Sequence, residues 1–276
     1  MVKGLYTAYT GMINEQHRMD VLTNNLANAN TNGYKKEGAT AQSFKDQLAL
    51  KIKDITDAPF TARGLGIINP GVKIGEGYVD WSEGPMKETH NAFDVAIGGR
   101  GFFAIDYTNK AINIERDTAG VQDIMYTRDG NFTLTNEGVL VTQDGDPVLS
   151  DQGNAIQINP NLPVEINTLG QIIQNGQVAG QIGLFDFEAN VRKDGYITYD
   201  TLEHYGENFF IPTDEAQEID ATGSIYAGFL EQSNVSVVDE MVQMIAVQRN
   251  YDTNQRMITT IDGTLDIAVN QLGRLS

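Results

Sequence analysis

Cysteine is absent from the 276 residues of this chain, and histidine occurs only three times. Without cysteine the protein has no disulfide, no cysteine-ligated zinc site and no thiol nucleophile. The three histidines leave little material for a histidine-rich metal site. The lack of cysteine does not indicate a compartment, because such a chain folds equally well in reducing and in oxidising surroundings.

Long apolar runs are also missing. No stretch approaches the roughly 18 consecutive apolar residues of a transmembrane helix, so we expect no direct insertion into a membrane. The apolar run that follows Lys3 is broken by Asn14 and Glu15, which is unlike the apolar core of a cleaved secretory signal. If the protein leaves the cytoplasm, we expect it to use a route without such a signal.

Positive charge is scarce and unevenly placed. Lys and Arg number 19 against 37 Asp and Glu, which gives a formal net charge of −18 at pH 7. This balance argues against nucleic acid and against an anionic membrane surface as partners. Residues 61–225 hold 25 acidic and 9 basic residues, whereas residues 1–60 hold 6 and 7. Near-neutral ends allow copies to crowd together while the acidic middle stays solvated. An acidic middle is equally compatible with an ordinary soluble surface.

An apolar stripe with heptad spacing runs along the N-terminal segment. Seven of its eight positions are apolar, which predicts a helix with a seam for a partner helix. The stripe consists of Leu5, Ala8, Met12, Glu15, Met19, Leu22, Leu26 and Ala29. An asparagine-rich stretch at residues 28–33 follows and is typical of the end of a helix.

The C-terminal segment carries the same pattern over a longer stretch. Ten of its twelve heptad positions are apolar or aromatic. One register is Val237, Met244, Tyr251, Ile258, Leu265 and Leu272, and the other is Glu240, Val247, Asn254, Ile261, Ala268 and Leu275. A second apolar face consists of Val238, Met241, Val242 and Ile245. Pairing of the two helices within one chain, or packing on the middle of the protein, leaves this second face unexplained. A helix among several neighbours requires it.

The middle of the chain is predicted to be rich in β-strands. Short apolar or alternating runs are separated by Asp-Gly and Asn-Gly pairs, which favour tight hairpins because glycine accepts a positive φ. These pairs are Asp129-Gly130, Asp144-Gly145, Asn175-Gly176 and Asp194-Gly195. We therefore predict an α+β protein. Its discontinuous N- and C-terminal helices, residues 1–34 and 233–276, form one coiled-coil-like domain. Residues 35–75 are expected to be a connector, and residues 76–232 an inserted β-rich outer domain.

Motifs for catalysis or cofactor binding are not found. Gly64-Leu65-Gly66 lacks the third glycine of a dinucleotide-binding loop, and Asp144-Gly145-Asp146 lacks the ligand pattern of an EF-hand. Nothing singles out a catalytic pair among the 37 acidic residues. We therefore expect no catalytic residue, no cofactor and no metal, and a protein that is not an enzyme. A secreted acidic β-rich hydrolase and a surface adhesin or fibre are the alternatives from other classes.

Long segments of the chain resemble one protein family. They are NNLANANTNGYKK (24–36), NAFDVAIGGRGFFAI (91–105), YTRDGNFTL (126–134), GVLVTQDGDPVL (138–149), LEHYGENFF (202–210) and GFLEQSNVSVVDEMVQMIAVQRNYDTNQRMI (228–258). In this order, and over essentially the whole chain, they are similar to the rod and hook proteins of the bacterial flagellum. TARGLGIINPGVKIGEG (61–77) resembles the distal rod pattern. The resemblance implies a structural subunit of the basal-body rod, with the distal rod as the leading assignment and a proximal rod paralogue as the alternative.

The fold that this resemblance implies agrees with the pattern of helices and strands. In this family the terminal helices form the inner coiled-coil layer of a helical tube, and the β domain forms the outer layer. The tube is a drive shaft that transmits torque from the motor to the hook. The resemblance also implies a location in the flagellar basal body. The implied partners are further copies of the chain, neighbouring rod and hook proteins, and the flagellar type III export apparatus.

The predicted subunit interface lies on both terminal helices. On the N-terminal helix the candidates are Leu5, Met12, Met19, Leu22, Asn24, Asn25, Leu26, Asn28 and Asn30. On the C-terminal helix they are Val237, Met241, Met244, Ile245, Val247, Tyr251, Asn254, Ile258, Ile261, Leu265, Leu272 and Leu275. Asparagine is a poor helix former. We therefore hypothesise that the amides of these asparagines bond between subunits and fix the register, the alternative being a frayed helix end and one tolerated polar site.

Overall fold

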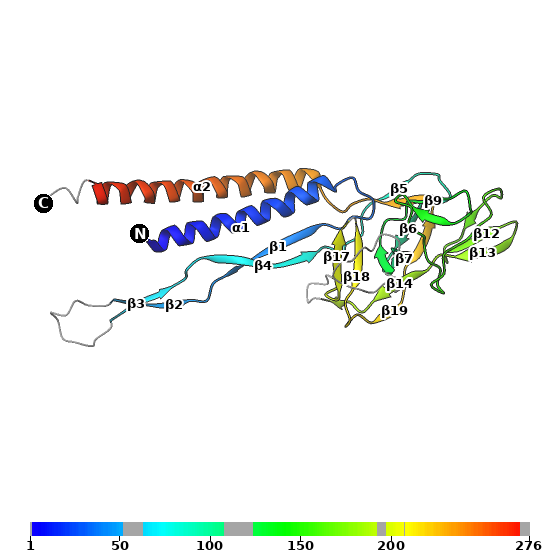
Figure 1. The fold of residues 1–276 in the computed structure, drawn as a ribbon, viewed down its shortest axis with the longest axis horizontal. Coiled ribbons are helices and arrows are strands. Elements are labelled where there is room, and N and C mark those ends of the chain that lie inside the picture. The colour runs from blue at the N-terminus through cyan, green and yellow to red at the C-terminus, as the bar shows by residue number, and fades with distance from the viewer. Residues whose placement is uncertain (1, 52–62, 108–123, 192–196, 207, 271–276) are drawn as a thin grey trace. The chain divides into compact units, whose positions relative to one another are not determined.

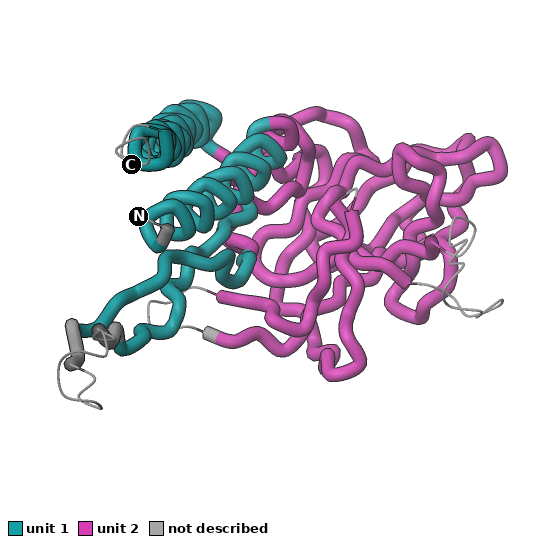
Figure 2. The backbone as a smooth tube through the Cα atoms, turned by 60° about the vertical axis from the view of Figure 1, so that its left-hand side comes forward, with its two compact units in different colours: residues 1–26, 37–78, 236–276 teal, residues 27–36, 79–235 magenta. Residues whose placement is uncertain are grey.

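The computed structural model describes residues 2–51, 63–107, 124–191, 197–206 and 208–270 (Figure 1). A helix lies near each end of the chain and the segment between them is rich in strands, which confirms the predicted α+β order. The chain divides into two compact units (Figure 2). Unit 1 comprises residues 1–26, 37–78 and 236–276, and unit 2 comprises residues 27–36 and 79–235.

The described residues of unit 1 form two helices and two pairs of strands. The helices are α1 (Val2–Ala27) and α2 (Val237–Asn270). The strands are β1 (Glu37–Ser43), which pairs with β4 (Val72–Val79), and β2 (Gln47–Lys51), which pairs with β3 (Arg63–Ile68). The stretch expected as a connector, residues 35–75, therefore carries strands over much of its described length.

The two helices lie side by side and run in opposite directions (Figure 1). Asn25 near the end of α1 bonds Glu240 near the start of α2. Earlier in α1, Gly11 lies against Asn254, and Gly4 lies against Ile261. Contacts thus move towards the C-terminus of α2 as they move towards the N-terminus of α1. The two helices therefore contact each other within one chain, and a coiled-coil geometry for them stays a prediction.

The first turn of α2 is acidic. The carbonyl oxygen of Ser236 accepts the hydrogen bond of the Glu240 N–H at 3.0 Å, which starts the helical ladder. Asp239 and Glu240 place carboxyl groups in this first turn, where the helix dipole favours negative charge. The local sequence therefore supports a helix that begins at Val237.

The main sheet of unit 2 has six antiparallel strands among the residues that the structure describes. Their order is β17 (Leu202–Gly206), β18 (Phe209–Pro212), β8 (Ile124–Thr127), β7 (Phe102–Asp106), β14 (Leu184–Phe187) and β19 (Glu218–Asp220). Phe102 and Ala104 of β7 belong to one apolar cluster, and Phe103 belongs to another. Because successive side chains of a strand point to opposite faces, β7 is covered on both sides of the sheet.

Smaller antiparallel sheets complete unit 2. The two-stranded pairs are β5 (Met86–Glu88) with β21 (Phe229–Glu231), β6 (Val95–Gly98) with β20 (Ser224–Ala227), β9 (Phe132–Leu134) with β10 (Leu140–Thr142), and β15 (Asn190–Val191) with β16 (Ile197–Thr198). The three-stranded sheet consists of β11 (Glu165–Ile166), β12 (Gln171–Gln174) and β13 (Gln177–Gln181).

One predicted hairpin turn is confirmed in detail. Asn175 and Gly176 connect β12 to β13 with φ values of 52° and 77°, so both residues of the two-residue loop have positive φ. This geometry matches the twist of antiparallel strands and explains the Asn-Gly pair. Asp194-Gly195 lies outside the described residues.

Candidate assembly site

One face of α2 is shielded from solvent along the length of the helix. Every position of α2 outside this face is exposed. The shielded positions are Glu240, Met244, Val247, Tyr251, Asn254, Ile258, Ile261, Leu265 and Ala268. They follow the two predicted heptad registers, and contacts at Asn254 and Ile261 turn this face towards α1. Of the remaining candidates, Val237 is exposed, and Leu272 and Leu275 lie outside the described residues.

The apolar stripe of α1 is also shielded from solvent. Leu22 and Ala8 are buried, and Leu5, Met12, Met19 and Leu26 are half-buried. A second face of α1 packs against the turn between β3 and β4. There the Thr7 hydroxyl donates to the carbonyl oxygen of Pro70 at 3.1 Å, and Gly71 lies against Thr10. The turn between β3 and β4 therefore covers part of α1, and α2 covers another part.

Asn25 and Glu240 form a buried polar pair between the two helices. Both side chains are fully buried, although most of their neighbours along this seam are apolar. Asn25 Nδ2 donates to Glu240 Oε2 at 3.3 Å and to the backbone oxygen of Glu37 at 2.8 Å. Its Oδ1 accepts the Glu37 N–H at 2.9 Å. The amide of Asn25 therefore joins α1 to α2 and to the start of β1 within one chain.

The other candidate asparagines have different surroundings. Asn24 is exposed, and its Nδ2 lies 3.4 Å from Glu37 Oε2. Asn28 Oδ1 accepts the Thr31 hydroxyl at 3.2 Å, in the turn that follows α1. Asn30 is exposed, and Asn254 faces Gly11 on the seam. A role of these amides between subunits stays a prediction.

The second apolar face of α2 is uncovered in the single chain. Its exposed fractions are 70% for Val238, 50% for Met241, 62% for Val242 and 53% for Ile245. These residues occupy the first turns of the helix, away from the heptad face. Large exposed apolar patches are typical of surfaces that bind another protein. Two of the predicted interface residues, Met241 and Ile245, therefore lie on an available surface.

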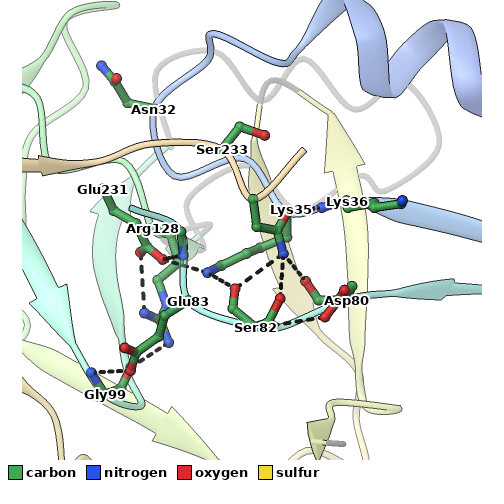
Figure 3. Close-up of polar contacts among 12 residues, drawn as sticks. Asn32, Lys35, Lys36, Asp80, Ser82, Glu83, Gly99, Arg128, Glu231 and Ser233 are labelled. Carbon is green, nitrogen blue, oxygen red and sulfur yellow. Dashed lines mark hydrogen bonds and ion pairs between the residues drawn. The ribbon is translucent and has the colours of Figure 1, made fainter. Parts of the chain in front are cut away.

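A cluster of three buried charges lies in unit 2, where Lys35, Arg128 and Glu231 meet (Figure 3). Lys35 Nζ is 2.6 Å from Glu231 Oε1, and Arg128 Nη1 is 3.4 Å from Glu231 Oε2. The Gly84 N–H also donates to Glu231 Oε1, at 3.0 Å. Burial lowers the pKa of Lys35 below its usual 10.5, while the charge of Glu231 opposes this shift and that of Arg128 adds to it. Glu231 thus compensates two buried cations.

Further hydrogen bonds, from the backbone and from the Asn234 side chain, join the segments that carry Lys35 and Glu231. The Gly33 N–H donates to the Glu231 carbonyl oxygen at 2.8 Å, and the Asp80 N–H donates to that of Lys36 at 2.8 Å. Asn234 Oδ1 accepts the Lys36 N–H at 2.8 Å, and its Nδ2 donates to the Asp80 carbonyl oxygen at 2.9 Å. Three segments, residues 33–36, 80–84 and 231–234, are therefore tied together.

The sequence gives little sign of this charge cluster. Lys35, Arg128 and Glu231 each lie in a segment that resembles the flagellar family, but they are far apart along the chain. Gly33 is the one local signal, because it has a φ of 66° and a Cβ there would overlap the backbone of Arg128. The fold alone brings the three charged groups together.

The described residues also show no metal cluster and no membrane-spanning helix. Among those residues, no group of three or more His, Cys, Asp or Glu side chains is arranged to hold a metal ion. Neither helix, over its described length, is long and apolar enough to cross a membrane.

Family models match three stretches of the chain. Residues 5–35 match the model described as "Flagella basal body rod protein". Residues 96–179 match "Flagellar hook protein FlgE/F/G D1 domain", and residues 226–272 match "Flagellar basal body rod FlgEFG protein C-terminal". These stretches cover most of α1, all of α2 and much of unit 2, and they include most of the helix seam and the charge cluster.

Curated relatives match the chain over nearly its whole length. The flagellar basal-body rod protein FlgG of Bacillus subtilis is 34% identical, over 98% of this chain and 99% of its own. The flagellar hook-basal body complex protein FlhO of the same organism is 31% identical, over the full length of both chains. The flagellar basal-body rod protein FlgF of Caulobacter vibrioides is 32% identical, again over the full length of both.

Proposed function

This chain belongs to the flagellar basal-body rod protein family, and on that premise we propose that it is a subunit of the distal rod. The subunits assemble into a helical tube that transmits torque from the motor to the hook. The paired helices α1 and α2 form the coiled-coil inner layer of that tube, and the β-rich unit 2 forms its outer layer. The segment at residues 61–77 supports the distal position through its resemblance to the distal rod pattern.

The observation that carries the proposal is the uncovered apolar face of α2. Val238, Met241, Val242 and Ile245 are all at least half exposed, although the opposite face of the same helix is already packed on α1. Burial of apolar surface stabilises an assembly by about 25 cal/mol per Å². Contact with the helices of neighbouring copies covers this face, because each helix in a bundle meets more than one partner.

The charge distribution fits the same arrangement. Unit 1 has 10 basic and 12 acidic residues, whereas unit 2 has 9 and 25. Near-neutral units pack closely with little repulsion, and strongly acidic units are best placed facing solvent. Unit 1 is therefore suited to the inside of a tube, and unit 2 to the outside.

The remaining proposals follow from the family. The chain is a structural protein and not an enzyme, and it lies in the flagellar basal body outside the cytoplasmic membrane. Its partners are further copies of itself and the neighbouring rod and hook proteins. It reaches its site through the flagellar type III export apparatus.

Electron microscopy of basal bodies from the source strain without this gene tests the proposal. A short rod stub without a hook is the expected result for a distal subunit. Loss of the whole rod assigns the chain to a proximal position instead. Intact basal bodies that carry hooks overturn the rod assignment, provided that no paralogue replaces the missing protein. Expression of the gene from a plasmid is the control and restores the rod.

A further inference from the structure

The charge cluster of unit 2 lies beside the points where the chain passes between the two units. These passages occur after residues 26, 36, 78 and 235. Three of them are within a few residues of the tied segments 33–36, 80–84 and 231–234. The structure thus gathers, inside unit 2, the ends of three peptide connections that lead to unit 1.

The charged groups of the cluster also bond the backbone of the surrounding segments (Figure 3). Lys35 Nζ donates to the Ser82 carbonyl oxygen at 2.8 Å as well as to Glu231. Arg128 Nη2 donates to the Gly99 carbonyl oxygen at 2.9 Å, and its guanidinium lies 5.3 Å from the ring centre of Phe102. The cluster therefore anchors the connecting segments to β7 and β8, in the middle of the main sheet.

Stability alone does not account for buried charges at this place. Removing charged groups from water is costly, and apolar replacements of a buried ion cluster are often as stable or more stable. The buried Nε of Arg128 has no hydrogen-bond partner among the described residues, which adds to the cost. An ion cluster instead favours one arrangement of the segments that carry it, because charged groups that move apart lose their partners.

Regular secondary structure holds these segments only weakly. Strand β21 has three residues, and its ladder with β5 covers only Phe229 to Glu231. Residues 33–36 belong to no helix or strand. A three-residue ladder is marginal by itself. The hydrogen bonds of the Lys35, Glu231 and Asn234 side chains therefore do much to hold these segments in position.

We propose that Lys35, Arg128 and Glu231 form a clasp that locks the connecting segments in one arrangement, so that unit 2 passes load along them to the helices. The load-bearing part rests on the proposed rod function, whereas the locking part does not. The clasp acts on local opening of residues 33–36, 80–84 and 231–234. It leaves the main sheet unaffected.

Two variants of the full-length protein test the locking. The first is the apolar triple replacement Lys35→Met, Arg128→Met and Glu231→Leu, and the second is the single change Lys35→Met. The matched control is Lys87→Met, which makes the same change at an exposed residue of β5, the partner strand of β21. Amide hydrogen exchange is read in the tied segments and in the β7–β8 ladder of the same molecule.

The expected result is local. Exchange in residues 33–36, 80–84 and 231–234 accelerates by about tenfold or more in both variants, while the β7–β8 ladder and the control keep their rates. Unchanged rates in the tied segments overturn the clasp. Equal acceleration in the ladder overturns it as well, since the cluster then serves the stability of the whole unit. If the triple variant does not fold, hydrogen exchange in the single variant Lys35→Met tests the clasp.

The load-bearing part is tested in cells that carry each variant as the only copy. We expect cells with the triple variant to assemble rods and hooks but to lose swimming speed in a viscous medium more steeply than control cells. Equal loss in both strains overturns the load-bearing part. The proposed rod function is tested separately, by microscopy of basal bodies from cells without the gene. A failure of the load-bearing part is therefore distinguishable from a failure of the rod function.

Discussion

Asn25 on α1 donates a hydrogen bond to Glu240 on α2 at 3.3 Å, across 215 residues of sequence, and both side chains are fully buried. The same amide bonds the backbone N–H and C=O of Glu37 at the start of β1. A buried polar pair costs stability in any register of the helices that separates its partners. This contact therefore fixes how α1, α2 and β1 align within unit 1.

Replacement of Asn25 by alanine is expected to destabilise unit 1 by about 2–3 kcal/mol, because it removes partners from buried polar groups. Urea unfolding followed by far-UV circular dichroism measures the change. Asn24→Ala is the matched control, since Asn24 is exposed and adjacent, and it is expected to change the free energy of unfolding by less than about 0.5 kcal/mol. Equal effects of both changes would show that the buried contact has no special weight.

Two glycines in the helices are expected to respond in opposite ways to alanine. A Cβ on Gly263 meets nothing within 4 Å, whereas a Cβ on Gly11 lies 3.0 Å from Asn254 Nδ2. Gly263→Ala is expected to stabilise the monomer by roughly 0.5–1 kcal/mol through helix propensity. Gly11→Ala gains less or loses stability, because the side chain of Asn254 has to shift. Thermal unfolding of the two variants measures both changes in stability. A larger gain in stability for Gly11→Ala than for Gly263→Ala contradicts the contact between Gly11 and Asn254.

The heptad pattern anticipates the structure of α2 well. The positions of Met244, Val247 and Tyr251 follow from periodicity, because a helix that packs along a neighbour shields every third or fourth residue. The turn at Asn175-Gly176 follows from local chemistry for a similar reason, since few residue pairs accept two positive φ values. Features that depend on a few neighbouring residues are therefore accessible from the sequence.

Contacts between residues far apart in the sequence could not be predicted. Lys35 and Glu231 are separated by 196 residues, and no local preference signals that two charged side chains will be buried together. The strand pairs β1–β4 and β2–β3 are also hard to predict, because their residues are mixed in polarity and show no regular alternation. Such features arise from the topology of the fold, and the sequence pattern alone favours a connector.

Met241 and Met244 provide a matched pair for the assembly surface. Met241 is exposed on the second apolar face of α2, whereas Met244 is half-buried on the face that meets α1. We expect Met241→Ser, combined with Ile245→Ser, to leave monomer stability within about 0.5 kcal/mol and to abolish rod assembly. Met244→Ser is expected to cost about 2 kcal/mol in the monomer itself. Unfolding experiments and electron microscopy of basal bodies measure the two effects. Normal rods in the double variant contradict the proposed surface.

The carboxyl group of Asp129 makes the stability of unit 2 depend on pH. The direction is opposite to that of a typical ion-paired acid. Burial raises its pKa from 3.8 to about 6, the nearby charges of Asp94 and Asp144 add to the shift, and the Asn131 N–H that it accepts opposes it. The folded state therefore holds this proton more tightly than the unfolded state does. The resulting penalty is absent below the unfolded pKa and grows to about 3 kcal/mol as pH rises past the folded pKa.

Asp129→Asn keeps an oxygen for the Asn131 N–H and removes the charge, so it is expected to stabilise unit 2. The gain is about 3 kcal/mol at about pH 7.5 and falls to about half of that at about pH 5, where the folded carboxyl is already protonated. Urea unfolding of both proteins at the two pH values measures it. Asp151→Asn, at an exposed turn position, controls for the general loss of one acidic residue from a strongly acidic unit. A gain that does not shrink on acidification, or one that the control matches, excludes a buried charge at Asp129 as its cause.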